Sequence, residues 1–501
     1  MLGGWAALGS GAPLALRAWH CREKIADCAR DMDAYDDARM RRAAASVVVL
    51  LLLYIVSGVA CTRHAMVIPS SGTGDSTVEP PVEEAVDSAQ KPEMPVSTDG
   101  SPGAGGAAIA VGTGGGGAGG SIGAGGTTGS GGTTGSGGTT GTRTIISMIA
   151  VGHGTTCAVV NGGAQCWGWN GYGQLGNGNT SDSHLPVQVQ GLTSGVTAIA
   201  AGMGHACAVV NGGVQCWGWN GYGQLGNGTA ADSRVPVQVQ GLTAGVSAIS
   251  AGAIQNNGNM GHTCAVVNGG VQCWGDNHAG QLGNGTTTES HVPVQVQGLT
   301  SGATAIAVSD DHSCAVVNGR TTCWGWNGEG KLGNGTTTES HVPIQAQGLT
   351  SGVTAVTAGY GFSCAVVNGG AQCWGGNELY STLGNSTVTK SPVPIQVEGL
   401  TSGVTAIAAG YIYACAVVGG EVWCWGDWGG HGQLGNGTMT GSPLPVQVQG
   451  LTSGVTAIAT DEAHTCALVN NGVQCWGGNF RGELGNNSTA DSPLPVHVQF
   501  P

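Results

Sequence analysis

The chain is poor in charged residues and phenylalanine, and basic residues are especially few. Of its 501 residues only 9% are Asp, Glu, Lys or Arg, and phenylalanine occurs three times. Fifteen Lys and Arg stand against 29 Asp and Glu, for a formal net charge of −14. A protein that neutralises nucleic-acid phosphates needs a basic face. Beyond residue 143 only five basic residues remain, so we expect no nucleic-acid partner: Arg234, Arg320, Lys331, Lys390 and Arg481.

Helical periodicity and familiar catalytic motifs are also missing from residues 143–501. No apolar stripe with a 3.6-residue period is long enough for a helix. There is no Gly-x-Ser-x-Gly nucleophile elbow, no P-loop and no pair of carboxylates at a repeated position. The sequence accordingly predicts no catalytic residue, no cofactor and no metal site.

A repeat dominates the rest of the chain. The chain contains seven successive copies of one pattern, in which eight residues separate a cysteine from Cys-Trp-Gly. The first cysteines of successive copies are 50, 57, 50, 50, 51 and 51 residues apart. Such a period is typical of a β-propeller. In the second copy, Gly, Asn and Ser clusters bound four short apolar or alternating runs, at residues 196–201, 207–210, 214–217 and 235–240. We therefore predict an all-β fold, a seven-bladed β-propeller of four-stranded blades.

Each unit places two cysteines opposite each other on a predicted hairpin. Asn211-Gly212 is the strongest signal for a type I′ turn, and folding there pairs Cys207 with Cys216. In this non-hydrogen-bonded pair the Cα atoms approach to ~4.5 Å, which suits a disulfide. Free cysteines serving as small core residues are the alternative, whereas zinc is disfavoured because CxxC spacing is absent. The predicted pairs are Cys157–Cys166, Cys207–Cys216, Cys264–Cys273, Cys314–Cys323, Cys364–Cys373, Cys415–Cys424 and Cys466–Cys475. Seven disulfides imply an oxidising compartment.

These repeats resemble the regulator of chromosome condensation family, here as a bacterial secreted or lipid-anchored member. The resemblance lies in Ala201-Gly202-Met203-Gly204-His205 and in Trp217-Gly218-Trp219-Asn220-Gly221-Tyr222-Gly223-Gln224-Leu225-Gly226, and it covers about residues 145–501. It implies a seven-bladed propeller. It also implies, by analogy, guanine-nucleotide exchange on a small GTPase, which we do not expect because that activity belongs to the nucleus.

Chain order predicts how the ring closes. The linker at residues 191–195 is short, so the last strand of one unit and the first strand of the next are expected to pair within one blade. The long segment after each Cys-Trp-Gly would then cross to the next blade. Residues 494–499 would complete the blade begun by residues 145–151, so that pairing of the N- and C-terminal strands closes the ring.

The N-terminal part divides into three segments. Residues 43–60 are an apolar run behind Met40-Arg41-Arg42, which predicts a signal peptide at 40–60. Residues 1–39 are then an extension that stems from an incorrect start codon. Residues 61–142 are acidic and then rich in Gly, Ser and Thr, the composition of a disordered tether. The propeller occupies residues 143–501.

The end of the apolar run indicates a membrane anchor. Gly58-Val59-Ala60-Cys61 resembles a bacterial lipobox, which implies lipidation of Cys61. Gly58 departs from the usual Leu, Val or Ile and also suits ordinary signal peptidase, so plain secretion stays open. An uncleaved signal is the third alternative, although 18 apolar residues are short for a membrane span. All three place the propeller outside the cytoplasm, either on the bacterial cell envelope, as an outer-membrane lipoprotein, or secreted.

Aromatic residues in the loop after each Cys-Trp-Gly are the candidates for binding, because protein interfaces are rich in them. Packing of the loop tryptophans between blades is the alternative. The candidate residues are Trp169, Tyr172, Trp219, Tyr222, Trp326, Glu329 and Lys331.

Three further features have weaker functional interpretations. Histidines recur two residues before a first cysteine, but Thr155, Phe362 and Tyr413 fill the same slot elsewhere, which favours a structural role in bridging strands. Asp310-Asp311 and Asp461-Glu462 are expected at equivalent loop positions, where a cation could bind. Seven extra residues between Gly252 and His262 are expected to protrude from one rim.

These observations predict a non-enzymatic recognition or scaffold propeller tethered to the cell surface, which binds a protein or other surface ligand through rim loops. One alternative is an extracytoplasmic lyase or hydrolase with its site in the central channel. Another is a surface-coat component without a discrete ligand.

Overall fold

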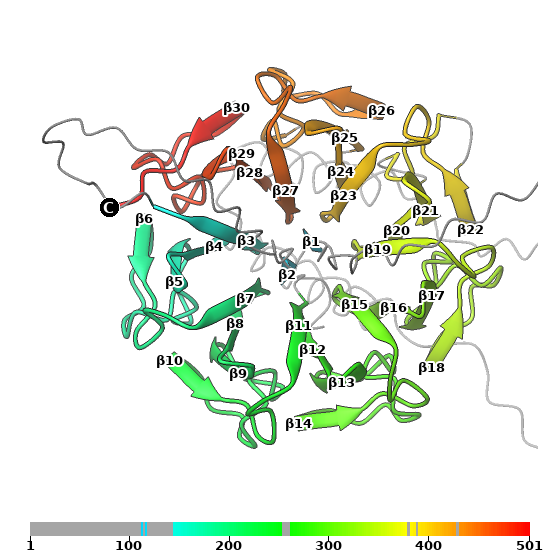
Figure 1. Cartoon of the computed structure of the whole chain (residues 1–501), viewed down its shortest axis with the longest axis horizontal. Coiled ribbons are helices and arrows are strands. Elements are labelled where there is room, and N and C mark those ends of the chain that lie inside the picture. Colours follow the sequence, from blue (N-terminus) through cyan, green and yellow to red (C-terminus); the bar gives the residue numbers. More distant parts are fainter. Residues whose placement is uncertain are drawn as a thin grey trace, which may run out of the picture. The chain divides into compact units, whose positions relative to one another are not determined.

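The computed structural model describes residues 112–113, 116–117, 144–252, 261–377, 381–386, 389–426 and 430–501. In these residues, strands β3 to β30 form seven four-stranded antiparallel blades around a central axis (Figure 1), and there is no helix. A helix able to cross a membrane is accordingly not found among them. The predicted all-β seven-bladed propeller is confirmed. The predicted signal peptide, Cys61, most of the tether and the inserted residues 253–260 lie outside the described residues.

The blades follow one another in chain order. Blade 1 contains β3 (Ile146–Gly152), β4 (Thr155–Val160), β5 (Gly163–Gly168) and β6 (Ser183–Gln188). Blade 2 contains β7 (Val196–Ala201), β8 (His205–Val210), β9 (Gly213–Gly218) and β10 (Ser233–Gln238). Blade 3 contains β11 (Val246–Ala251), β12 (His262–Val267), β13 (Gly270–Gly275) and β14 (Ser290–Gln295). Blade 4 contains β15 (Ala303–Val308), β16 (His312–Val317), β17 (Arg320–Gly325) and β18 (Ser340–Gln345).

The remaining three blades have the same order. Blade 5 contains β19 (Val353–Ala358), β20 (Phe362–Val367), β21 (Gly370–Gly376) and β22 (Lys390–Gln396). Blade 6 contains β23 (Val404–Ala409), β24 (Tyr413–Val418), β25 (Glu421–Gly426) and β26 (Ser442–Gln447). Blade 7 contains β27 (Val455–Thr460), β28 (His464–Val469), β29 (Gly472–Gly477) and β30 (Ser492–His497). Two short strands from the Gly-rich segment, β1 (Gly112–Thr113) and β2 (Gly116–Gly117), pair with each other, and Thr113 pairs with Ala409 in β23.

The central hairpin of each blade forms as its sequence predicts. Asn161 and Gly162 have φ of 51° and 76°, as a type I′ turn requires. Cys207 pairs with Cys216 in the predicted register. All seven predicted disulfides are present, with Cα atoms 4.0–4.1 Å apart, and every one of these cysteines is fully buried.

The order of strands within a blade differs from the prediction. Each blade is one contiguous piece of chain, with its first strand nearest the axis and its fourth outermost (Figure 1). The long segment after Cys-Trp-Gly therefore joins the third strand to the fourth of the same blade, and the short linker leads to the next blade. The cause lies in Asn170, whose side chain bonds to the backbone of Leu175, Asn179 and Ser181. These bonds fold the segment back on itself.

Ring closure differs from the prediction for the same reason. β3 pairs with β4 and β30 pairs with β29, so the terminal strands do not share a blade. Blade 7 instead packs against blade 1 through an apolar cluster that includes Ile149, Trp167 and Leu484. The Trp167 indole Nε1 also donates to the Glu483 carbonyl across this boundary, at 2.8 Å.

The indole bond recurs at every blade boundary. In each blade the tryptophan of Cys-Trp-Gly is buried, and its Nε1 donates to a carbonyl in the loop of the preceding blade at 2.8–2.9 Å. The long loop thus contacts the next blade and returns to its own. This contact fixes the position of the loop that carries the candidate binding residues.

Candidate interaction rim

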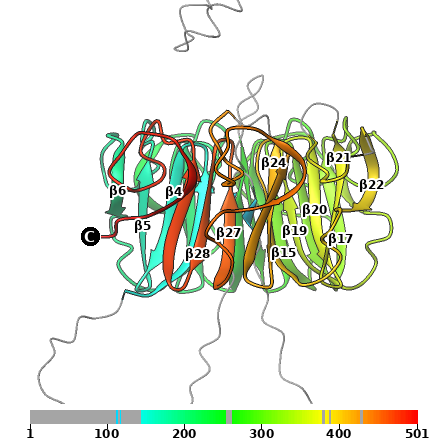
Figure 2. The ribbon, with the colours of Figure 1, turned by 90° about the horizontal axis from the view of Figure 1, so that it is seen from above.

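Two sets of loops form two different rims of the ring. The loops between the first and second strands, and between the third and fourth strands, emerge together on what we call the variable rim. The hairpin turns and the linkers between blades emerge on the opposite side, which we call the uniform rim. Figure 2 shows the ring from the side, with one rim at each edge.

The uniform rim is nearly the same in every blade. All six linkers contain Gly-Leu-Thr, then Ser or Ala, then Gly, and five of the seven hairpin turns are Asn-Gly. None of these turns and linkers contains an aromatic residue. The chain also enters the first blade on this side, because Ile145 bonds to the backbone and side chain of Asn161 in the first hairpin turn.

The variable rim differs from blade to blade. Among the described residues six large hydrophobic side chains are exposed, and four of them lie in loops between third and fourth strands: Tyr172, Trp326, Met439 and Phe480. These loops are nevertheless held firmly. In the first one, the Asn170 side chain accepts from Leu175 N at 2.9 Å and donates to the Ser181 carbonyl at 2.9 Å, while Asp182 accepts from Asn170 N at 2.9 Å. A preorganised loop loses little entropy on binding.

Four of the predicted binding residues form one continuous aromatic stripe across blades 1 and 2, namely Trp169, Tyr172, Trp219 and Tyr222. The ring centroids of successive members are 5.4, 6.0 and 5.7 Å apart. Tyr172 is 37% exposed and the other three are partly exposed. At the axial end, His153 lies 5.8 Å from Trp169 and extends the stripe.

Glycines fix the orientation of the two indoles in the aromatic stripe. A Cβ added at Gly171 would lie 2.9 Å from the Trp169 Nε1, and one added at Gly221 would lie 2.6 Å from the Trp219 ring. Each indole therefore rests on the backbone of its own loop. Rigid aromatic side chains of this kind are typical anchors of protein interfaces.

The other three predicted binding residues lie elsewhere. Trp326 is 45% exposed and Glu329 is exposed, both in blade 4. Lys331 does not reach the surface: it is 2% exposed, and its Nζ lies 2.6 Å from the Asp311 carboxylate and 2.9 Å from the Tyr360 carbonyl. The structure thus assigns Lys331 to the interior of the loop.

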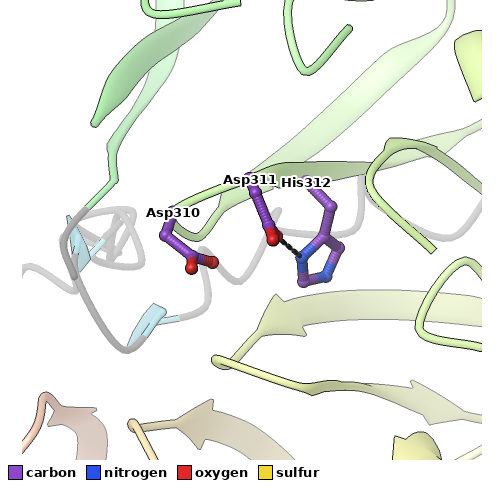
Figure 3. A group of neighbouring side chains, drawn as sticks. All are labelled: Asp310, Asp311 and His312. Carbon is purple, nitrogen blue, oxygen red and sulfur yellow. Dashed lines mark ion pairs between the residues drawn. The ribbon is translucent and has the colours of Figure 1, made fainter. Parts of the chain in front are cut away.

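Asp310, Asp311 and His312 form a buried cluster at the start of β16. Figure 3 shows the Asp311 carboxylate facing the His312 ring, with the Asp310 carboxylate on the other side of Asp311. The three offer ligand atoms within 4.8 Å of one another, as a metal site would require. However, Asp311 already binds the Lys331 ammonium, and the two His312 nitrogens bond to Ser309 and Ser363 at 2.7 and 2.9 Å. The geometry is that of a buried ion pair in which a lysine supplies the cation.

The two aspartates of this cluster titrate in opposite directions. Burial, together with the neighbouring Asp311 charge, raises the pKa of Asp310 to about 8. Burial alone would also raise the pKa of Asp311, but the Lys331 ammonium holds it well below its usual range. At neutral pH, Asp310 is therefore protonated and Asp311 ionised.

The predicted equivalence between Asp310-Asp311 and Asp461-Glu462 is wrong by one position. Counted from the histidine that begins the second strand, Asp461 corresponds to Ser309, and Glu462 corresponds to Asp310. Asp461 bonds to His464 Nδ1 at 3.0 Å, the place that the Ser309 hydroxyl takes beside His312. Glu462 bonds to His153 of blade 1 at 2.6 Å. The two carboxylate pairs are therefore not a repeated site.

The recurring histidines bridge strands, as predicted, and the strands that they join belong to neighbouring blades. His205 Nε2 lies 3.0 Å from the Thr263 hydroxyl of blade 3, and that hydroxyl donates to the Gln224 carbonyl. Because Thr263 uses its hydroxyl proton in the bond to the Gln224 carbonyl, His205 must carry its proton on Nε2 and donate it to the Thr263 oxygen. Burial lowers the pKa of His205 to about 4, so the ring is neutral.

Sequence reasoning missed His153 and the aspartates beside the aromatic stripe. Asp182 and Asp232 cap the backbone of Asn170 and Asn220, which directly follow Trp169 and Trp219. A signal was present, since an acidic residue followed by Ser opens the fourth strand in five units. His153 had no such signal, because its place beside the stripe depends on the fold of the first loop.

Comparison with known proteins agrees with this architecture. A family model described as the regulator of chromosome condensation (RCC1) repeat matches residues 161–209, 211–254, 268–316, 318–366 and 419–468, and a second RCC1 repeat model matches residues 196–224. The chain belongs to the RCC1 repeat family. The first match runs from the Asn-Gly turn of blade 1 into β8 of blade 2, so the family's repeat is offset from the structural blade.

Similar sequences and structures cover different parts of the chain. The E3 ubiquitin-protein ligase HERC2 of Homo sapiens and that of Mus musculus are each 37% identical over 91 residues, which is 18% of this chain and 2% of theirs. Human WBSCR16 matches with a TM-score of 0.58 and 24% identity, over 67% of this chain and 93% of that one. Yeast RCC1 (Prp20) bound to Kap60 matches with a TM-score of 0.57 and 20% identity, over 67% and 83%. The chain thus spans 2% of the length of these curated relatives, and the structural likenesses show the fold.

Proposed function

We propose that this RCC1 repeat propeller is a non-enzymatic recognition module that binds a protein partner through its variable rim, outside the cytoplasm. The observation that carries the proposal is the contrast between the two rims. The seven units build the same blade and almost the same uniform rim, yet their variable-rim loops differ and carry most of the exposed aromatic groups. Ring formation does not require that variation, whereas recognition does.

The aromatic stripe is the best candidate for the contact surface. Its rings are continuous, partly exposed and braced by glycines. Solved relatives of this fold bind proteins: yeast Prp20 has been crystallised with Kap60, and Prp20p has been studied for its binding to Gsp1p and histones. These partners belong to those proteins, and they support a protein partner here at the level of the fold.

Two features favour a location outside the cytoplasm. Seven buried disulfides suit an oxidising compartment. The chain enters the first blade on the uniform rim, so the residues directly before β3 approach from the side opposite the aromatic stripe. We propose that residues 61–142 tether the propeller to an envelope membrane through lipidated Cys61, or that the protein is secreted.

Capture experiments with the full-length exported protein test the proposed function. Surface proteins crosslinked to the wild type are compared with those crosslinked to a variant carrying Trp169→Ala and Trp219→Ala. We expect the variant to lose the partner, with affinity reduced at least about tenfold, or ~1.4 kcal/mol. A control variant on the uniform rim, Thr243→Ala with Thr300→Ala, should capture normally. Equal capture by all three proteins would contradict recognition through the stripe.

An enzymatic function is the second candidate, and the Asp310–Asp311 pair favours it. Two adjacent buried carboxyl groups with opposite pKa shifts are common at catalytic sites. If they act on a substrate, Asp310→Asn should abolish turnover on an array of candidate substrates while partner capture is unchanged. Such a result would show that the propeller is an enzyme in addition to a recognition module.

A further inference from the structure

We infer that the partner presents a basic, arginine-bearing protein segment to the variable rim. This inference rests on the proposed function and adds the chemistry of the partner. It is carried by the distribution of charge between the two rims and by the position of carboxylates along the aromatic stripe.

Carboxylates are concentrated on the variable rim. Of the 14 Asp and Glu in the described part of the propeller, all but Glu398 and Glu421 lie in variable-rim loops. Six of those on the variable rim are exposed: Asp182, Asp232, Glu289, Glu329, Glu339 and Glu462. A rim of this composition attracts cations and repels nucleic acids and anionic lipid headgroups.

The exposed basic residues of this rim do not cancel that charge near the axis. Lys390 belongs to the outermost strand β22. Arg234 belongs to the outermost strand β10 and lies against Gly173, on the side of Tyr172 away from the axis. Arg481 is 58% exposed and lies 3.4 Å from Asp182. Within the described residues the loops nearest the axis hold no exposed Lys or Arg, whereas they hold exposed Glu462.

Three carboxylates are anchored to the loops that carry the stripe. Asp182 caps the residue after Trp169, and Asp232 caps the residue after Trp219, at 2.9 and 2.8 Å. Glu462 lies at the axial end, bonded to His153. The Arg481–Asp182 pair shows that a guanidinium fits beside the first of these carboxylates.

Arginine suits this arrangement better than lysine does. Its planar guanidinium stacks on an aromatic face and bonds to a carboxylate with its edge at the same time. A lysine ammonium is a strongly hydrated point charge and gains less from the rings. We therefore expect the partner segment to bind through arginines placed between the aromatic and acidic groups.

Peptide binding tests the inference directly. Fluorescein-labelled peptides of equal length, with alternating Gly-Arg, Gly-Lys or Gly-Glu, are titrated with the full-length exported protein and followed by fluorescence anisotropy. We expect Gly-Arg to bind most tightly, Gly-Lys more weakly and Gly-Glu not at all, with affinity falling as salt is added. The triple variant Asp182→Asn, Asp232→Asn, Glu462→Gln should weaken Gly-Arg binding about tenfold, or ~1.4 kcal/mol.

Controls separate charge from folding. The asparagine side chains introduced by Asp182→Asn and Asp232→Asn keep an oxygen that can accept from the backbone of Asn170 and Asn220. An unchanged thermal midpoint verifies that the triple variant is folded. Glu398→Gln with Glu421→Gln, on the uniform rim, should leave binding unchanged. Binding of Gly-Glu as tight as that of Gly-Arg, binding of neither peptide, or full binding by the triple variant would each overturn the inference.

Failure here is distinguishable from failure of the proposed function. A partner captured through the aromatic stripe whose contact surface is acidic or neutral, and whose capture does not depend on salt, leaves the recognition function standing. That result would overturn only the inference that the partner segment is basic.

Discussion

At the scale of single residues, the seven units act as an internal series of substitutions. In each blade, the residue that begins the second strand pairs with the residue just before the first cysteine of the next blade. Five of these pairs join a ring to a hydroxyl at 2.6–3.0 Å: His205–Thr263, His262–Ser313, His312–Ser363, Tyr413–Thr465 and His464–Thr156. The other two pairs lack the hydroxyl. The position before the first cysteine of the next blade is Ala206 in the pair with Thr155 and Ala414 in the pair with Phe362. The chain thus matches a polar ring with a hydroxyl and Phe362 with an alanine.

A double substitution that copies the apolar pair into blade 2 tests this matching. Thr263→Ala alone leaves the buried His205 Nε2–H without its acceptor and should cost about 1–3 kcal/mol. His205→Phe with Thr263→Ala should recover at least about 1 kcal/mol of that loss, because Gly202 leaves room for the ring as Gly359 does beside Phe362. Denaturant unfolding of the wild type, both single variants and the double variant gives the coupling energy. A coupling near zero would show that the two residues do not act as a pair.

The same double variant should respond less to acid. Below about pH 6.5 unfolded histidine binds a proton, whereas folded His205, with its pKa lowered to about 4 by burial, does not. The stability of the wild type therefore falls as the pH drops from about 6.5 towards 4. Removing His205 removes one of the groups responsible, so unfolding measured across that window should show a smaller slope.

Asp310 has the opposite effect on stability. With its pKa raised to about 8, the folded protein keeps a proton that the unfolded chain releases near pH 4, so Asp310 lowers stability as the pH rises through this window. Asp310→Asn should therefore be more stable than the wild type at pH 9, with little difference at pH 4. Thermal melts at both pH values measure this, and Glu329→Gln in the same blade is the matched control. A less stable Asp310→Asn at pH 9 would mean that the carboxylate is ionised and makes favourable contacts.

At the scale of elements, the hairpin is the unit whose stability is most local. Each disulfide closes a loop within one hairpin, and none joins two blades. Neighbouring blades are joined instead by indole and hydroxyl bonds and by apolar packing. Loss of one disulfide should therefore loosen one hairpin and leave the ring closed.

Removing the pair in blade 2 tests this expectation. Cys207→Ala with Cys216→Ala should cost about 2–3 kcal/mol, the usual effect of a short disulfide loop. Hydrogen exchange should rise in β8 and β9 and stay unchanged in the blades that do not touch them. Free thiols at these positions in the exported wild-type protein would contradict the disulfide and the oxidising compartment together.

The hairpin could be predicted in full, because its determinants are adjacent in the chain. The turn residues fix the register, and the register decides which cysteines meet. The connection to the fourth strand could not be predicted, because it depends on which of several loop asparagines forms the hydrogen bonds to the backbone. Nothing in the sequence distinguishes Asn170 from its neighbours in this respect. The aromatic candidates were predicted from composition alone. The burial of Lys331 could not be predicted, because its partner Asp311 lies in a different loop, 20 residues earlier in the chain.

At the scale of the whole molecule, the boundary between blades 7 and 1 is the one that no linker crosses. In addition to the indole bond, it carries the charged contact of His153 with Glu462 at 2.6 Å. His464, which is paired with Asp461 of its own blade at 3.0 Å, also bonds across the boundary to the Thr156 hydroxyl at 2.8 Å. Burial opposes protonation of both histidines, but the neighbouring carboxylates raise their pKa above the usual value. His153 also contacts Trp169, so the boundary and the aromatic stripe share a residue.

Because every blade is a single contiguous piece of chain, the ring has no preferred starting point. Opening any Gly-Leu-Thr linker and joining the two ends of the propeller, residues 144 and 501, would give a circular permutant whose blades keep all their strand pairings. Duplication of one whole blade would likewise require no exchange of strands with a neighbour. A propeller built this way can change the number and order of its rim loops without redesigning its frame.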